Sequence, residues 1–265
     1  MEITGQTKII GLLADPIAQV RTPAALNPQL AEAGHNMVVV PLHVPAENLS
    51  SAWAGLKRIK SLAGLLATVP HKPAIPALCE HVEPSARQVG AANTVRREAD
   101  GSMRCATFDG QGFVGGLLKR GYDPAGKRAI VAGAGGAGSA VAFALAEAGA
   151  EEVAIHNRTP AKAEALAARI AEHFPSVKTR AAGPNPAGFE LVVNGTSLGM
   201  AADDAPPFEF DGLSADMMVA EVVMKPDITP LLTAAEAKGA QIQLGVEMLK
   251  EQLARILAFL TADPA

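Results

Sequence analysis

The stretch Ala129-Ile-Val-Ala-Gly-Ala-Gly-Gly-Ala-Gly-Ser139 decides the fold of this chain. Its first four residues are apolar and predict a buried strand, and the alanine-rich segment after the glycines predicts a helix. Glycines between a strand and a helix permit a tight turn and let the backbone approach a pyrophosphate, which the N–H groups of the helix N-terminus can bind. The stretch therefore predicts a Rossmann-like dinucleotide-binding domain that begins near the middle of the chain.

Composition and charge exclude several classes of function. The chain has 265 residues, 49% of them hydrophobic and 19% charged, which is enough to bury the cores of one or two domains. Its net charge is −4 and it has no strongly basic tract, which argues against nucleic acid or an anionic membrane as a partner. We find no run long enough to cross a bilayer and no signal-peptide pattern. We therefore expect a cytoplasmic protein, either a monomer or a homodimer.

The metal-ligating residue types do not predict a metal site. Cys79 and Cys105 are the only cysteines, too few for a disulfide framework or a thiolate metal site. The histidines show no ligand spacing, and His71 has no second ligand near it in the sequence. We expect no bound metal, and we interpret both cysteines as small buried apolar residues.

Strands and helices alternate before the glycine stretch. Apolar runs predict strands at residues 8–13, 37–42 and 62–69. Helices are predicted at residues 22–33 and 46–59, and Thr22 followed by Pro23 is typical of an N-cap and the first helical residue. A hairpin is predicted at residues 91–97 and 103–107, and a helix at residues 109–119. This alternation indicates an open parallel sheet.

The same alternation returns after the glycine stretch. Strands are predicted at residues 128–132, 152–156, 191–194 and 218–222. Helices are predicted at residues 136–148, 159–173, 230–238 and 246–260. The sequence thus predicts two α/β domains with parallel-type sheets and an active site in the cleft between them. We place a substrate-binding and catalytic domain at residues 1–109 and the Rossmann-like domain at 110–245, with a C-terminal helix within 246–265 packing back on the first domain.

The segment Asn157-Arg158-Thr159, together with Lys162, predicts which dinucleotide is bound. An NAD-preferring domain carries an acidic residue near this point to hold the ribose 2′-hydroxyl, and none is present. The donors and positive charges found instead suit a 2′-phosphate. We therefore favour NADP, with NAD possible. Alternatively, Thr159 only caps the following helix and Arg158 is a solvated surface residue.

Polar motifs follow the predicted strands of the first domain. Thr68-Val-Pro-His-Lys72 lies at the carboxyl end of a strand, where open sheets bind ligands. Gly90-Ala-Ala-Asn-Thr94 and Thr107-Phe-Asp-Gly110 follow it. Each motif also has a purely structural interpretation: Asp109 as an N-cap, Lys72 as a solvated lysine and Asn93 as a residue that bonds its own turn.

Taken together, these motifs resemble the shikimate/quinate dehydrogenase family. The match continues with Asn157-Arg-Thr159, with Asn194-Gly-Thr-Ser-Leu-Gly-Met200 and, less closely, with Gly245-Val-Glu-Met-Leu-Lys-Glu-Gln252. It extends over essentially the whole chain in the family's order. It implies a dehydrogenase that transfers a hydride between NADP and shikimate, or a close cyclic hydroxy acid, in aromatic amino acid biosynthesis. Alternatives are a quinate or aminoshikimate-type dehydrogenase using NAD, and an NADPH-binding sensor module with little or no turnover.

The resemblance also implies roles for single residues. Lys72 and Asp109 correspond to the catalytic pair, with Lys72 handling the proton of the reacting hydroxyl. Asn93, Asp109 and Gln252 correspond to residues that bind ring hydroxyls, with Thr68 nearby, although a glutamine on an amphipathic helix is usually exposed. Thr22 corresponds to a serine that binds the carboxylate. The positions that match cofactor contacts are Gly133, Ala134, Gly135, Gly136, Ala137, Asn157, Arg158, Thr159, Lys162, Val222 and Gly245.

Several positions depart from the family pattern, among them Thr107-Phe108, where the family's motif has Asn-Thr, and three that bear on the substrate. Val20 stands where the family has a serine, Leu66 where it has an asparagine, and Met224 where it has a tyrosine. Val20 and Met224 match positions that bind the substrate carboxylate. Because a hydrogen bond to a charged group is worth about 1.5–3 kcal/mol, the resemblance implies altered recognition of that carboxylate.

Overall fold

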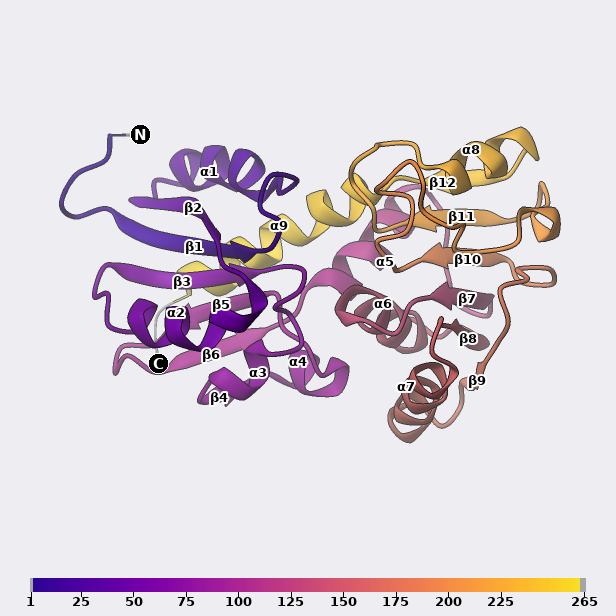
Figure 1. The fold of residues 1–265 in the computed structure, drawn as a ribbon, viewed down its shortest axis with the longest axis horizontal. Coiled ribbons are helices and arrows are strands. Elements are labelled where there is room, and N and C mark those ends of the chain that lie inside the picture. The colour runs from indigo at the N-terminus through magenta and orange to yellow at the C-terminus, as the bar shows by residue number, and fades with distance from the viewer. Residues whose placement is uncertain (1, 263–265) are drawn as a thin grey trace. The chain divides into compact units, whose positions relative to one another are not determined.

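The computed structural model describes residues 2–262, which divide into two compact units (Figure 1). Unit 1 is Met1–Phe108 with Leu253–Ala265, and unit 2 is Asp109–Gln252. Each unit is built on its own β-sheet. The two-domain α/β fold that the sequence predicts is therefore confirmed.

The sheet of unit 1 has the strand order β2-β1-β3-β5-β6-β4. Its strands are β1 (Lys8–Ala14), β2 (Met37–His43), β3 (Leu62–Ala67), β4 (His81–Val82), β5 (Thr94–Arg97) and β6 (Met103–Ala106). The predicted parallel sheet is only partly correct, because β5 runs antiparallel to both of its neighbours. The turn around Gly101 is the reason: so short a connection can only join antiparallel strands.

Two predicted helices of unit 1 differ from the structure in their details. The helices of this unit are α1 (Thr22–Glu32), α2 (Leu49–Leu56), α3 (Ile75–Leu78), α4 (Pro84–Val89) and the end of α9 (Gly245–Thr261). Arg21, not Thr22, is the N-cap of α1, and its side chain makes no capping bond. The predicted helix 46–59 is a 3₁₀ turn, Ala46–Asn48, followed by α2, which stops before the exposed Ile59.

The core of unit 1 lies under β1, β3, β5 and β6. Leu65, Val95 and Met103 are fully buried there, and Trp53 of α2 packs against the same cluster. Both cysteines belong to this cluster, Cys105 buried and Cys79 half-buried, close to the prediction of small apolar residues. This packing fixes the strand ends from which the proposed site residues project.

Unit 2 has the parallel strand order β12-β11-β10-β7-β8-β9, which is the doubly wound order of a Rossmann domain. Its strands are β7 (Arg128–Ala132), β8 (Glu152–His156), β9 (Lys178–Ala181), β10 (Leu191–Asn194), β11 (Met218–Glu221) and β12 (Gln241–Gln243). Its helices are α5 (Asp109–Lys119), α6 (Gly136–Glu147), α7 (Pro160–His173), α8 (Pro230–Ala237) and the start of α9, with a 3₁₀ turn at Phe210–Gly212. The order reverses between β7 and β10, and ligands bind at such switch points.

Small residues let the helices of unit 2 approach closely. A Cβ atom on Gly110 of α5 would overlap the Ala140 carbonyl oxygen of α6 and lie 2.7 Å from the Ala144 Cβ. One on Gly112 would lie 2.6 Å from the Met248 carbonyl oxygen of α9. The alanine-rich composition of α6 follows from this packing, because nine of its twelve residues are buried.

Neither a membrane-crossing helix nor a metal-ligand cluster is found in the described part of the chain. Across residues 2–262, each helix is too short or too polar to cross a bilayer. Within the same residues no group of His, Cys, Asp and Glu side chains is placed to hold a metal ion.

Candidate active site

The segment from Thr68 to Lys72 leaves the carboxyl end of β3 and crosses the end of β1. The Thr68 N–H donates to the Leu13 carbonyl (3.0 Å), and the Asp15 N–H donates to the Val69 carbonyl (3.1 Å). After β1 the chain continues to β2 on one side of the sheet, and after β3 it continues to β4 on the other side. The carboxyl ends of β1 and β3 are therefore the topological switch point of unit 1. The predicted motif is therefore at the edge where an open sheet binds its ligand.

Lys72 is held at this edge through its backbone and its neighbour. Its carbonyl accepts a hydrogen bond from the Ala92 N–H (3.0 Å), and its side chain is half-buried. The buried ring of His71 bonds through Nε2 to the Val44 carbonyl (2.8 Å). The position of Lys72 is therefore fixed relative to the loop that carries Asn93.

Asn93 joins several segments at the same edge. Its carbonyl accepts from the Ala67 N–H (2.9 Å) and its N–H donates to the Ala106 carbonyl (3.1 Å). Its Oδ1 accepts from the Thr94 hydroxyl (2.8 Å) and from the Phe108 N–H (3.3 Å). The side chain is buried, so Asn93 does more than stabilise its own turn: it holds the segment that leads to Asp109.

The other predicted residues of unit 1 lie in different settings. Thr68 is half-buried, and Thr22 is half-buried at the start of α1. Val20 is half-buried in the loop before that helix. Leu66 is buried within β3, where it pairs with Thr94, so its apolar side chain suits its surroundings.

Two predicted substrate residues belong to unit 2. Asp109 is the first residue of α5 and is buried, and a carboxylate in the first turn interacts favourably with the helix dipole. Gln252 of α9 is buried, which argues against the alternative that it is an ordinary exposed glutamine. The reason is Gly112 of α5: the Gln252 Cβ lies 2.8 Å from where a Cβ on Gly112 would be.

The glycine loop of unit 2 has the geometry that a dinucleotide site requires. Gly133 has φ +100°, a conformation that favours glycine, and its N–H donates to the His156 carbonyl (2.7 Å). A Cβ on Gly138 would overlap the Gly133 carbonyl oxygen, so α6 packs directly on the turn. A Cβ on Gly135, the N-cap of α6, would have open space around it, which leaves room for a pyrophosphate.

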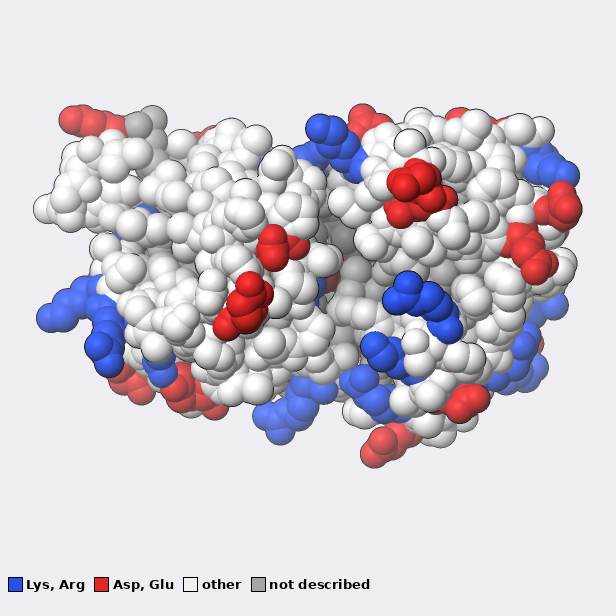
Figure 2. All heavy atoms as spheres, in the orientation of Figure 1, with Lys and Arg blue, Asp and Glu red and all other residues white. Residues whose placement is uncertain are grey.

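Asn157 ties the end of β8 to the glycine loop. Its Oδ1 accepts from the Ala134 N–H (3.1 Å), and its Nδ2 donates to the Thr159 carbonyl (3.0 Å). Thr159 is the N-cap residue of α7, but its hydroxyl makes no capping bond, which argues against the alternative that Thr159 only caps the helix. Arg158, Thr159 and Lys162 are exposed. Lys and Arg side chains also gather around α6 and α7 on the face that Figure 2 shows.

Val222 and Gly245, which match cofactor positions, lie near each other in unit 2. The Val222 N–H donates to the Asn194 carbonyl (3.1 Å), so this residue continues the pairing of β10 and β11. A Cβ on Gly245 would lie 2.9 Å from the Val222 carbonyl carbon. The N-terminus of α9 therefore packs directly against the segment that follows β11.

A buried polar network at the ends of β10 and β11 was not predicted. Asn194 and Glu221 are paired across these strands and are fully buried. The Asn194 amide donates to Glu221 Oε1 (3.1 Å) and Oε2 (2.9 Å), and the Thr229 hydroxyl donates to Oε1 (2.7 Å). Thr229 also caps α8 by accepting from the Leu232 N–H (3.3 Å). The sequence signal that could have indicated this network is Glu221, an acidic residue at the end of an apolar strand.

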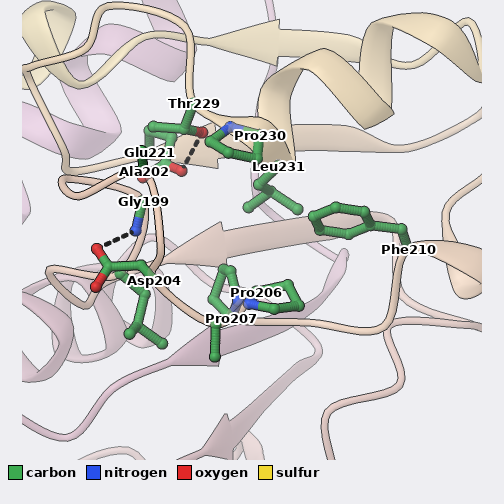
Figure 3. A pocket seen from close by; sticks show the side chains of 12 residues that line it. Gly199, Ala202, Asp204, Pro206, Pro207, Phe210, Glu221, Thr229, Pro230 and Leu231 are labelled. Carbon is green, nitrogen blue, oxygen red and sulfur yellow. Dashed lines mark hydrogen bonds between the residues drawn. The ribbon is translucent and has the colours of Figure 1, made fainter.

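Burial raises the pKa of Glu221 to about 7, and its hydrogen bonds from Thr229 and Asn194 limit the rise. Glu221 and Thr229 line one side of a pocket of about 190 Å³ in unit 2 (Figure 3). Phe210, Pro206 and Pro207 line it as well, and Asp204 anchors its loop by accepting from the Gly199 N–H (2.9 Å). None of these lining residues is a predicted cofactor contact, so this pocket is distinct from the glycine loop.

Comparison with known proteins identifies the family. The family profile of the shikimate dehydrogenase substrate binding domain matches residues 12–95. The profile of shikimate/quinate 5-dehydrogenase matches residues 117–184. A curated shikimate dehydrogenase (NADP(+)) of Rubrobacter xylanophilus is 39% identical over 258 residues, covering 94% of this chain and 89% of that protein.

Solved structures give the same result. Shikimate 5-dehydrogenase of Thermus thermophilus in complex with NADP(H) and shikimate is 32% identical with a TM-score of 0.86, covering 98% of this chain and 95% of that one. A 5-ketofructose reductase of Gluconobacter, in its ligand-free form, is 31% identical with a TM-score of 0.84 and the same coverage. The strand edges, the glycine loop and these likenesses lead to one conclusion: the chain belongs to the shikimate dehydrogenase family.

Proposed function

We propose that this protein is an NADP-dependent dehydrogenase that interconverts shikimate and 3-dehydroshikimate. The observation that carries the proposal is that backbone hydrogen bonds hold both Lys72 and Asn93 at the β1/β3 switch point of unit 1. The proposal is supported by the relatives, among them one solved in complex with both NADP(H) and shikimate.

The reaction requires a group that exchanges a proton with the substrate. Oxidation of a secondary alcohol removes a hydride from carbon and a proton from oxygen, and NADP, when bound, accepts the hydride. We assign the proton to Lys72, which takes it from the hydroxyl during oxidation and returns it to the ketone oxygen during reduction. Lysine suits this task because its pKa responds readily to burial and to neighbouring charge.

We assign recognition of the ring hydroxyls to Asn93, Asp109 and Gln252. All three are buried, which limits the rotamers that each side chain can adopt before the substrate arrives. Thr68 and Thr22 are the proposed hydroxyl donors in unit 1, Thr22 toward the carboxylate.

The residues of unit 2 fit a dinucleotide with a 2′-phosphate. The open space at Gly135 and the N-terminus of α6 suit the pyrophosphate, which Gly133, Ala134, Gly136 and Ala137 would also contact. Exposed Arg158, Thr159 and Lys162 offer two positive charges and a hydroxyl to the 2′-phosphate. Val222 and Gly245 complete the proposed cofactor contacts.

The test is an absorbance assay of the purified chain with shikimate and NADP, and in reverse with 3-dehydroshikimate and NADPH. We expect turnover in both directions. If no absorbance change is seen with shikimate, quinate or aminated analogues, with either NADP or NAD, the proposal is overturned and the alternative of an NADPH-binding sensor module is left.

We further propose that the enzyme works in the cytoplasm as a monomer or homodimer without nucleic acid, and light scattering measures its oligomeric state.

A second candidate is reduction of a polyhydroxy ketone that lacks a carboxylate. Val20 and Met224 offer no hydrogen bond at positions that match carboxylate contacts, and the 5-ketofructose reductase shares this fold. Parallel assays with NADPH and either 5-ketofructose or 3-dehydroshikimate distinguish the two. A higher kcat/KM with 5-ketofructose would favour this candidate.

A further inference from the structure

Glu221 carries a carboxyl group that the proposed proton chemistry does not use. The groups within hydrogen-bond reach are donors: the Asn194 amide, the Thr229 hydroxyl and the Val223 N–H, which lies 3.4 Å from Oε2. A carboxylate accepts hydrogen bonds at both oxygens, whereas an amide in its place would offer one acceptor and turn an N–H₂ toward these donors. The surroundings therefore match a carboxylate and not its amide isostere.

The carboxylate fixes the orientation of the Asn194 side chain. Because Nδ2 must face Glu221, Oδ1 faces the turn that follows β10. There Oδ1 accepts from both the N–H (3.0 Å) and the hydroxyl (2.6 Å) of Thr196. The same hydroxyl accepts from the Leu198 N–H (3.0 Å), and the Leu198 carbonyl accepts from Asn194 Nδ2 (2.9 Å). Residues 194–198 thus form one hydrogen-bonded turn whose base is Glu221.

This turn packs directly against the glycine loop. A Cβ on Gly195 would lie 2.7 Å from the Gly138 Cα atom, so the two backbones are in contact. A Cβ on Gly133 would lie 2.8 Å from the Thr196 Cγ2 atom and 3.1 Å from the Gly195 carbonyl oxygen. A shift of the turn would therefore move the backbone that we assign to the pyrophosphate.

We propose that Glu221 is a positioning residue for the dinucleotide, acting through Asn194 on the turn that supports the glycine loop. The proposal rests on the cofactor site proposed above, but not on the identity of the substrate. It assigns Glu221 no contact with the cofactor, and it predicts that the pyrophosphate and nicotinamide part of NADPH loses affinity when the carboxylate is removed.

The decisive variant is Glu221→Gln in the whole chain, with NADPH binding followed by fluorescence titration without substrate at about pH 8, where the Glu221 carboxyl is ionised. We expect the Kd of NADPH to rise about tenfold, the result of losing hydrogen bonds to a charged group. Adenosine 2′-monophosphate, which carries the 2′-phosphate but no 5′-phosphate to contact the glycine loop, should keep its affinity within about twofold, because distant sites act independently. Equal losses for both ligands, or no loss for NADPH, would overturn the proposal.

Two further variants distinguish a positioning role of Glu221 from a general loss of structure. Glu190→Gln makes the same chemical change just before β10, where Glu190 pairs with Arg128 (3.1 Å), and it should leave NADPH affinity unchanged. Glu221→Asp keeps a carboxylate and should recover most of the affinity. A Glu221→Asp variant as weak as Glu221→Gln, with both folded, would contradict the requirement for a carboxylate.

If Glu221→Gln does not fold, Thr196→Val tests the other end of the network. Valine keeps a methyl group toward Gly133 but removes the hydroxyl that links Asn194 to Leu198. We expect a weaker but selective loss of NADPH affinity, with the affinity for adenosine 2′-monophosphate unaffected, and unchanged NADPH affinity would count against the proposal. Because these readouts need no turnover, an inactive wild-type enzyme that binds NADPH would refute the proposed reaction without touching this inference.

Discussion

Lys72 can lose its side chain without leaving a cavity in a core. It is only half-buried, and the hydrogen bond from Ala92 is made by its carbonyl. We expect Lys72→Ala to lower kcat by a factor of about 10²–10⁴, the usual contribution of a positioned acid or base, with little change in Tm. Steady-state assays and thermal unfolding measure both, and Lys60→Ala at an exposed position is the control. Near-normal turnover in Lys72→Ala would refute the assigned role.

Arg158 is exposed and lies at the end of β8, so its removal should act on the cofactor alone. We expect Arg158→Ala to raise the KM of NADPH about 10–100-fold, because a charge-assisted bond to phosphate is lost. NADH, which has no 2′-phosphate, should be unaffected. Arg120→Ala, at another exposed position of unit 2, is the control. Better turnover with NAD than with NADP in the wild-type protein would contradict the assignment.

The raised pKa of Glu221 makes stability depend on pH. This pKa rises from its ordinary value of 4.5 to about 7, so between those values the folded state holds a proton that the unfolded state has released. The free energy of unfolding should therefore fall as the pH rises through this window, by no more than about 3 kcal/mol relative to Glu221→Gln. Urea unfolding of both proteins at about pH 5 and about pH 8 measures the difference. A difference that does not change with pH would show that Glu221 titrates normally.

At the scale of elements, the contact between β7 and α6 depends on one glycine. A Cβ on Gly138 would meet the backbone of Gly133, whereas one on Gly135 would meet nothing within 4 Å. We expect Gly138→Ala to lower the free energy of unfolding by about 1–3 kcal/mol through overpacking, and to weaken NADPH binding. Gly135→Ala should leave stability nearly unchanged, and urea titrations compare the two. Equal stability of the two variants would contradict this account.

Most elements of unit 2 could be predicted because each central strand is an apolar run that ends in a turn. The bounds of β7, β8 and β10 match the prediction, and β11 is one residue shorter. The edge strands β9 and β12 were missed, since their sequences, Lys178-Thr-Arg-Ala181 and Gln241-Ile-Gln243, are largely polar. An edge strand has a neighbour on one side only, so it needs no continuous apolar run.

The site could be predicted only in part. Motif spacing indicates Lys72, Asn93 and the glycine loop, because these lie at strand ends. The burial of Gln252 could not be predicted, because it depends on a glycine of α5 far away in the sequence. The role of Glu221 depends on its pairing with Asn194, which only the sheet order creates.

At the scale of the whole molecule, the end of α9 completes unit 1. Leu260 is buried and lies 2.9 Å from where a Cβ on Gly64 would be. The Phe259 ring packs edge-on against Phe108 with centroids 5.6 Å apart, and the Arg96 guanidinium lies 5.2 Å from the ring centroid. We expect Leu260→Ala to lower the stability of unit 1 by about 2–5 kcal/mol and to leave the Kd of NADPH unchanged. Calorimetry and fluorescence titration check this, with Ala258→Ser at an exposed position as the control.

The order of the two units along the chain also constrains when each can fold during synthesis. Unit 2 is one continuous segment, whereas unit 1 needs Leu253 and the residues after it. During synthesis unit 1 therefore cannot be completed before all of unit 2 has been translated, and the apolar surface around Gly64 and Phe108 stays uncovered until the last turns of α9 emerge. The unit translated first thus cannot complete its fold ahead of the unit that follows it, unlike the usual order for successive domains. A nascent chain stalled before Leu253 emerges should bind chaperones through unit 1 alone.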